Sequence, residues 1–257
     1  MSRNFELMQQ AASATTNSTV GGIAELISAE PRTKTRNVKA LTVRPNIGVD
    51  QVAREEALRL VQRVFRTPGQ EHRTVVFAAI SSGSGCSWIC ARVAEMLARN
   101  ISGNVCLVDA NFRTPSLPEV LGTSSDHGLS DALRRERPAR EFVNHLEPSN
   151  LWLLSCGSAP EAAVGLLASE RMKALINELQ QEFEYVLIDA PPIGHYSDTL
   201  GIGQLADGLV VVLEANVTRR EVAAKAIDRL RDLNVNILGA VLNKRTFLIP
   251  DSLYQIL

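Results

Sequence analysis

Six short apolar segments alternate with helix-like patterns from residue 73 onward, and this alternation limits the possible folds more than any other feature. The apolar segments lie at 74–81, 104–109, 151–155, 185–189, 208–214 and 237–243, and helical patterns cover 87–99, 166–182, 197–205 and 218–233. Most of the apolar segments are continuous runs of Val, Leu and Ile, which is typical of parallel strands covered by helices on both faces. We therefore expect an α/β fold with a doubly wound, mostly parallel sheet, and a ligand site beyond the carboxyl ends of its strands.

Length and composition are those of an ordinary globular chain. The 257 residues are 45% hydrophobic and 21% charged, and the formal net charge is -1, so no global field favours nucleic acid or an anionic membrane. No apolar run approaches the roughly 18 residues needed to span a bilayer, and the first residues lack the apolar stretch of a signal peptide. We therefore expect a cytoplasmic protein that has no nucleic-acid partner.

The sequence divides into two parts near residue 45. Residues 1–45 are rich in Ser, Thr, Ala and Asn and are predicted to form a mobile tail with a short helix at 3–12. Residues 46–257 are predicted to form one domain, which opens with a helix over about 49–65. Four cysteines lie within apolar segments and lack C-x-x-C spacing, which favours buried, reduced thiols over a zinc site. They are Cys86, Cys90, Cys106 and Cys156.

The first predicted strand leads through a glycine-bearing loop into a predicted helix. In this context a loop that ends G-K-[ST] cradles phosphates with its backbone N–H groups, its lysine reaches phosphate oxygens, and its hydroxyl holds Mg²⁺. Gly85 and Ser87 match their places in that motif, but Cys86 occupies the place of the lysine. The loop therefore predicts a phosphate site without its usual point charge. The candidate nucleotide-binding residues are Gly83, Ser84, Gly85, Cys86, Ser87 and Trp88.

Polar side chains end three other predicted strands. Asp109 and Asp189 each end an apolar strand, where a carboxylate commonly holds Mg²⁺ or orients its water. Asn243 ends the last strand with an amide, whose paired donor and acceptor suit a purine edge. An isolated Asp or Asn at a strand end can instead cap the next turn. Two aspartates together with the loop favour a shared site, with Asp109 and Asp189 as catalytic groups and Ser87 as a third metal ligand.

Several segments, taken in order, resemble the bacterial tyrosine kinases that accompany capsule and exopolysaccharide export, a family of P-loop ATPases. The resemblance covers about residues 50–245. After the loop come D-A-N-F-R-T-P at 109–115, G-L-S-D-A-L at 128–133, N-L-W-L-L-S-C-G at 150–157, L-L-A-S-E-R-M at 166–172, D-A-P-P at 189–192, and the segments 207–208 and 239–243. The family's E-x-x-R-x-x-R helix corresponds to 56–62, where Gln62 replaces the last arginine.

The resemblance implies a P-loop protein that binds ATP and Mg²⁺. It places the phosphates on Gly83, Ser84, Gly85 and Ser87, Mg²⁺ and its waters on Asp109 and Asp189, and the base on Asn243. It also implies a role in exopolysaccharide or capsule assembly beside a membrane chain-length determinant, a polysaccharide co-polymerase, which would hold the chain at the cytoplasmic face of the inner membrane. Glu56 and Arg59 would contribute to a homo-oligomer contact, although a solvated Glu–Arg pair on a helix also explains them.

The sequence departs from the family pattern at the site itself. Cys86 replaces the lysine, Asn111 replaces the second carboxylate after the strand, Trp88 replaces a threonine and Ser84 replaces a glutamate. The C-terminal tyrosine cluster of the family is reduced to Tyr254. Phosphoryl transfer depends on positioning and electrostatic stabilisation, and the loss of one such group typically costs ~10²–10³ in rate.

Two functions are therefore compatible with the sequence. The first is a degenerate kinase, or pseudokinase, that works as a regulatory or docking partner with weak or no ATP turnover. The alternative is an active ATP-dependent protein-tyrosine kinase or ATPase with an atypical phosphate loop, in which Arg113, Lys244 or a partner's arginine replaces the lysine. A membrane-cycling ATPase of the partition type is less favoured, because 246–257 would make a poor amphipathic membrane helix. The ring of Trp88 would either stack on a ligand or block the site.

Overall fold

The computed structural model describes residues 47–245, apart from positions 67, 68, 70, 125, 136, 148 and 159. The tail predicted for residues 1–45, its helix at 3–12, and Tyr254 lie outside the described residues, so the domain boundary near residue 45 remains a prediction. Within the described part of the chain, no helix is both long enough and apolar enough to cross a membrane.

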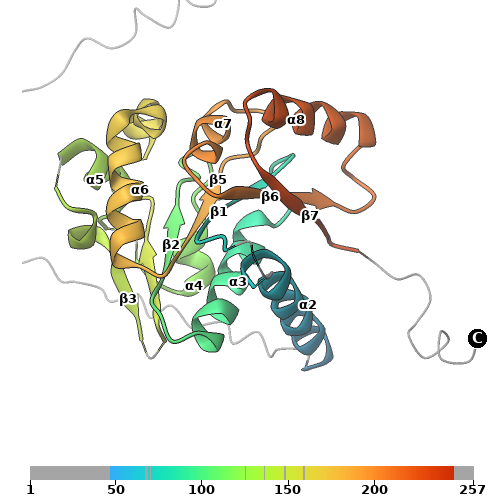
Figure 1. The fold of residues 1–257 in the computed structure, drawn as a ribbon, viewed down its shortest axis with the longest axis horizontal. Coiled ribbons are helices and arrows are strands. Elements are labelled where there is room, and N and C mark those ends of the chain that lie inside the picture. The colour runs from blue at the N-terminus through green and yellow to red at the C-terminus, as the bar shows by residue number, and fades with distance from the viewer. Residues whose placement is uncertain are drawn as a thin grey trace, which may run out of the picture. The chain divides into compact units, whose positions relative to one another are not determined.

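A sheet of seven strands forms the centre of the described region (Figure 1). The strands are β1 (Thr74–Ala79), β2 (Val105–Asp109), β3 (Asn144–Leu146), β4 (Leu151–Leu154), β5 (Tyr185–Ala190), β6 (Gly208–Glu214) and β7 (Ile237–Asn243). Their order is β3-β4-β2-β5-β1-β6-β7, and all neighbours are parallel except β3 and β4. The doubly wound, mostly parallel α/β sheet predicted from the sequence is therefore confirmed, and all six predicted strands are present.

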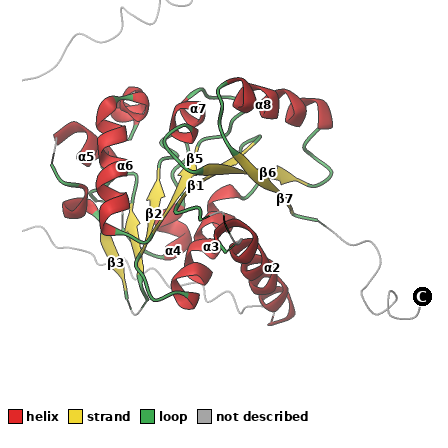
Figure 2. Ribbon diagram, viewed as in Figure 1, coloured by secondary structure: helices red, strands yellow, loops and turns green. Residues whose placement is uncertain are grey.

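Helices cover both faces of this sheet (Figure 2). One face carries α2 (Ile47–Phe65), α3 (Cys86–Asn100) and α4 (Leu117–Leu121), and the other carries α5 (Leu129–Arg135), η1 (Ala139–Phe142), η2 (Glu161–Ala168), α6 (Glu170–Glu182), α7 (Asp198–Gly203) and α8 (Arg220–Asp232), where η marks a 3₁₀ helix. Val75 and Phe77 of β1 belong to the hydrophobic cluster of α2 and α3, whereas Val76 and Ala78 belong to that of α6 and α8. This burial on both faces explains the continuous apolar runs in the sequence.

The helix predicted over 166–182 is wrong in one respect, because the structure divides it at Ser169. Residues before that position form η2, and α6 begins directly after it. Ser169 has an extended backbone, and its hydroxyl accepts a hydrogen bond from Met172 N at 3.3 Å. The serine therefore caps α6 by satisfying an N–H group that has no partner inside the helix.

The two edges of the sheet are less covered than the sequence pattern predicts. Gly239, Ala240 and Leu242 of β7 are exposed although they lie in an apolar run. An edge strand has a neighbour on one side only, so part of its surface stays open. At the other edge, β3 was not predicted, because its three residues are mostly exposed and form no apolar run.

All four cysteines are buried free thiols, as the sequence predicts. Within the described residues, no group of three or more His, Cys, Asp and Glu side chains could hold a metal ion. Two of the thiols, Cys86 and Cys90, lie in the first turns of α3, beside the loop that follows β1.

Candidate functional site

The loop between β1 and α3 has the shape of a phosphate cradle. Gly83 and Gly85 have φ of 82° and 83°, a left-handed conformation that L side chains rarely adopt. A Cβ on Gly85 would clash with Nδ2 of Asn243, so any other residue there would also displace the Asn243 side chain. Gly85 is the N-cap of α3, and no side chain of the described residues caps that end, which leaves the first N–H groups of the helix available for an anion. The Ser84 hydroxyl braces the loop by donating to Ser81 O at 2.9 Å.

Two buried aspartates lie side by side at the carboxyl ends of β2 and β5. The strands pair in parallel with Asp109 opposite Asp189. Asp189 Oδ2 accepts a hydrogen bond from the Ser87 hydroxyl at 2.5 Å, while its Oδ1 has no partner among the described residues. Asp109 instead accepts from Asn111 N at 3.2 Å and from Leu117 N at 3.3 Å. Asp109 therefore also caps the following turn, whereas Asp189 keeps one buried oxygen for another ligand.

The surroundings of the two carboxyl groups favour their protonated forms. Burial raises the pKa of Asp189 to about 6, against the opposing hydrogen bonds from Ser87 and Cys86. Burial, and then the charge of Asp189, raise the pKa of Asp109 to about 8, against hydrogen bonds from the backbone N–H groups that follow it. At neutral pH the pair therefore holds about one negative charge and one proton between them.

Cys86 occupies the lysine position without supplying a charge. Its thiol is buried in the first turn of α3 and is hydrogen-bonded to the carboxylate of Asp189. Burial, and then the negative charge of Asp189, raise the pKa of this thiol well above its ordinary value, so it stays neutral at physiological pH. The same two causes, in the same order, raise the pKa of Cys90 one turn later. The start of α3 therefore presents neutral thiols to Asp189.

The indole of Trp88 lies along its own helix. It is 40% exposed, and the guanidinium of Arg92 lies 5.3 Å from the ring centroid, within the range of a cation–π contact. Arg92 in turn pairs with Glu95 at 2.9 Å. One face of the Trp88 ring is therefore engaged by Arg92, on the surface of α3.

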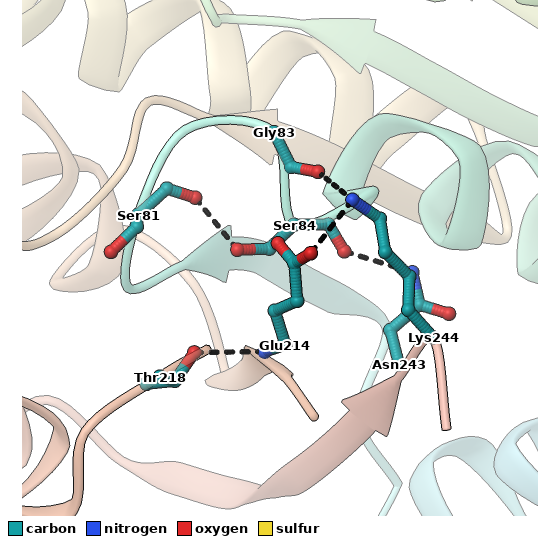
Figure 3. Close-up of polar contacts among 7 residues, drawn as sticks. All are labelled: Ser81, Gly83, Ser84, Glu214, Thr218, Asn243 and Lys244. Carbon is teal, nitrogen blue, oxygen red and sulfur yellow. Dashed lines mark hydrogen bonds and ion pairs between the residues drawn. The ribbon is translucent and has the colours of Figure 1, made fainter. Parts of the chain in front are cut away.

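The end of β7 is tied to the phosphate loop (Figure 3). Asn243 Nδ2 donates to Ser84 O at 2.8 Å. Lys244 Nζ donates to Gly83 O at 2.7 Å and pairs with Glu214 Oε1 at 3.0 Å. The role of Asn243 toward a base remains a prediction, and the structure adds that its amide nitrogen braces the loop.

A second set of contacts joins the loops that follow the two aspartates. Arg113, after β2, pairs with Asp198 at 3.3 Å, and its guanidinium lies 4.6 Å from the ring centroid of Tyr196, after β5. Asn111, for which the resemblance predicts a carboxylate, donates from its amide to Thr114 Oγ1 at 3.2 Å. The charge of Arg113 is therefore engaged by Asp198 and Tyr196, and Asn111 serves the turn after β2.

Comparison with known proteins identifies the family. Residues 71–256 match the ParA family, described as NUBPL iron-transfer P-loop NTPase. The chain belongs to the ParA family. This ParA-family chain is 29% identical over 179 residues to the tyrosine-protein kinase YwqD of Bacillus subtilis, and the match covers 70% of the chain and 75% of YwqD. It is 25% identical over 181 residues to the putative tyrosine-protein kinase CapB of Staphylococcus aureus, and this match covers 70% of the chain and 79% of CapB.

A solved kinase domain shares the ParA-family fold. The crystal structure of the VpsO kinase domain superposes with a TM-score of 0.69 at 24% identity, covering 77% of this chain and 99% of the VpsO domain. Together with the sequence relatives, this likeness confirms the resemblance to bacterial tyrosine kinases that the sequence predicts.

The structure gathers the predicted site residues at the carboxyl ends of the strands of the ParA-family sheet, except Trp88, whose ring lies against Arg92 on the surface of α3. The loop residues and Ser87 lie beside Asp189 and Asp109, while Asn243 reaches the loop from β7. Glu56 and Arg59 form an exposed ion pair at 2.6 Å on α2 and belong to no part of this cluster. The roles of all these residues toward ATP, Mg²⁺ or a second copy remain predictions.

One residue of this cluster was not predicted from the sequence. Glu214 ends β6 with a carboxylate, the same signal that points to Asp109 and Asp189, yet its partner Lys244 follows another strand, β7. The sequence indicates Lys244 only as one of several cations that could replace the lysine. Its contacts with Gly83 and Glu214 now place it at the loop.

Proposed function

We propose that this ParA-family chain is a degenerate, tyrosine-kinase-like protein of exopolysaccharide or capsule biosynthesis, acting as a regulatory or docking partner with weak or no ATP turnover. The observation that carries the proposal is the buried, neutral thiol of Cys86 at the place of the phosphate-binding lysine. Phosphoryl transfer requires charge stabilisation on the phosphate oxygens. Loss of one preorganised group typically lowers the rate by ~10²–10³. The absence of the lysine should therefore impair ATP turnover more strongly than ATP binding.

The residues around Asp189 fit a magnesium ion. The Ser87 hydroxyl and the unpartnered, buried Oδ1 of Asp189 are hard oxygen donors of the kind that Mg²⁺ prefers, and Asp109 lies beside them to orient its waters. When bound, Mg²⁺ supplies charge neutralisation to the phosphates of a nucleotide. Carboxylates bind metal in their deprotonated form, so the aspartate pair would release its proton as the ion enters.

The backbone of the loop fits phosphate groups. The left-handed glycines keep the loop open, and the uncapped start of α3 offers N–H donors to an anion. Ser87 would serve both the loop and the ion, because its hydroxyl already lies on Asp189. The chain would thus orient a nucleotide without the lysine that stabilises the transferred group.

The partner that we propose is a membrane chain-length determinant, a polysaccharide co-polymerase, which would hold the chain at the cytoplasmic face of the inner membrane. Support comes from relatives named as tyrosine-protein kinases and from the kinase-domain fold. A homo-oligomer would use the exposed Glu56 and Arg59 of α2, which pair with each other within one chain and could pair with a second copy.

The alternative is an active ATP-dependent protein-tyrosine kinase or ATPase with an atypical phosphate loop. One observation favours it: Ser87, Asp109 and Asp189, the proposed magnesium ligands, lie together as an active enzyme would require. A cation from outside the loop would then have to replace the lysine.

Turnover distinguishes these two functions. Mg²⁺-dependent phosphate release and phosphotyrosine formation would be measured on the full chain, on Cys86→Lys and on Cys86→Ser, which keeps a small neutral side chain as the matched control. We expect background turnover from the natural chain and from Cys86→Ser, and a measurable rate from Cys86→Lys that Asp189→Asn then removes. Turnover by the natural chain that is lost in Asp189→Asn would instead establish the active enzyme.

A further inference from the structure

The lysine that follows β7 turns back onto the phosphate loop (Figure 3). Lys244 has a φ of 56°, a conformation that residues other than glycine rarely adopt and that persists where surrounding contacts hold it. Its Nζ donates to Gly83 O at 2.7 Å. The other lysines in the described part of the chain, Lys173 and Lys225, lie on α6 and α8. The ammonium of Lys244 is therefore the lysine charge that the described structure brings to the loop.

Neighbouring contacts position the Lys244 ammonium beside the loop and leave it able to donate to a further acceptor. Its Nζ pairs with Glu214 Oε1 at 3.0 Å, and the N–H of Glu214 donates to Thr218 Oγ1 at 2.9 Å. Asn243 fixes the end of β7 through its bond to Ser84 O. The Lys244 side chain is 49% exposed and that of Glu214 is 18% exposed. An ammonium has three donors, so after Gly83 and Glu214 one donor is left for another acceptor.

We propose that Lys244 supplies the positive charge for phosphates bound in the loop, in place of the lysine that Cys86 has replaced. The inference rests on the proposed function in that the loop is taken as a phosphate site. A lysine is a compact charge on a flexible stem, so its ammonium can turn from Glu214 toward a phosphate oxygen. Because Nζ approaches from the carbonyl side of Gly83, it would support phosphate binding more than transfer of the terminal phosphoryl group.

Calorimetry with Mg²⁺ and inorganic tripolyphosphate, which carries the phosphate chain without a base, tests this role on the full chain. Lys244→Met removes the charge, and we expect the Kd to rise on the order of tenfold or more, as for the loss of a charge-assisted contact. Lys244→Arg keeps the charge and should remain within about threefold of the natural chain. Lys173→Met is the matched control, because that lysine is also half-exposed and lies 3.8 Å from a glutamate, but on α6.

Glu214→Gln tests whether Lys244 acts through its charge on the phosphates or only by bracing the loop. The substitution removes the carboxylate that competes for the ammonium and keeps its size, so binding should tighten several-fold if Lys244 serves the phosphates. Thermal unfolding of each variant shows whether it is folded.

Three results would overturn the proposal. They are unchanged binding by folded Lys244→Met, weaker binding by folded Glu214→Gln, and no binding by the natural chain at millimolar tripolyphosphate. The last result would leave the docking role of the chain standing. Rapid ATP turnover by the natural chain would contradict the docking role and leave the Lys244 assignment intact.

Discussion

Replacing Asp189 with asparagine should stabilise the protein, because it removes a charge whose burial is unfavourable. Burial raises the pKa of this carboxyl from its ordinary value of 3.8 to about 6. The folded state therefore holds the proton more tightly than the unfolded state, so the free energy of unfolding falls as the pH rises from about 4 to about 6 and stays lowered above that range. At ~1.36 kcal/mol per pKa unit, the difference corresponds to ~3 kcal/mol. The new amide must find an acceptor, so we expect a net gain of about 1–2 kcal/mol.

Urea unfolding in EDTA at about pH 8 and about pH 4.5 measures this gain. The Asp189→Asn variant should be more stable at the higher pH, and the difference should shrink toward zero as the pH approaches the ordinary pKa of an aspartate. Added Mg²⁺ should stabilise the natural chain and leave the stability of the variant unchanged, because the substitution replaces the anionic carboxylate of Asp189 with a neutral amide.

Asp131→Asn is the matched control for this prediction. The Asp131 side chain is 2% exposed, but its carboxylate accepts hydrogen bonds from Ser158 N at 3.1 Å, Ser158 Oγ at 2.9 Å and Gly128 N at 3.2 Å. Burial alone would raise the pKa of Asp131, yet these bonds and the charge of Arg135 outweigh it and lower the pKa. The same substitution should therefore destabilise the protein here. Equal losses of stability in the two variants, at both pH values, would show that the buried charge of Asp189 does not destabilise the fold.

Two further predictions concern the same region. The natural chain should lose stability as the pH rises from about 4 to about 8 in EDTA, because the folded state binds protons on Asp109 and Asp189 more tightly than the unfolded state does. A pH series of urea unfolding measures this loss. A free energy of unfolding that rises over this range would contradict the prediction. Gly85→Ala should lower the free energy of unfolding more than Gly83→Ala, because both residues have positive φ, worth ~1–2 kcal/mol, but only the Cβ at Gly85 meets Asn243. Thermal unfolding of the two variants measures the difference, and equal losses would show that Asn243 yields.

The interior of the fold could be predicted from the sequence because its signals are local. Strands buried on both faces produce continuous apolar runs, and the phosphate loop is a contiguous segment between a strand and a helix. The division of 166–182 at Ser169 was missed because a cap can interrupt a helical pattern without changing its periodicity. The open surface of β7 was missed because an apolar run does not tell an edge strand from a central one.

The contacts of the site were less predictable because they depend on the order of the strands. Lys244 and Gly83 are 161 positions apart, and they meet because β6 and β7 follow β1 in the sheet. Asp109 and Asp189 have the same place in the sequence pattern, yet packing gives one of them two backbone N–H partners and leaves an oxygen of the other without a partner among the described residues. Such differences arise from tertiary packing, which local patterns do not encode.

We propose that the site keeps the shape of a phosphate site but lacks the positive charge of a lysine at position 86. Calorimetry of Mg²⁺-ATP binding to the natural chain and to Cys86→Lys, measured side by side, distinguishes the effect of this charge from that of the loop's shape. We expect Cys86→Lys to bind Mg²⁺-ATP on the order of tenfold more tightly or better, because a lysine there would face both the phosphates and the carboxylate of Asp189. A folded Cys86→Lys variant that binds no more tightly than the natural chain would show that the missing charge does not limit nucleotide binding.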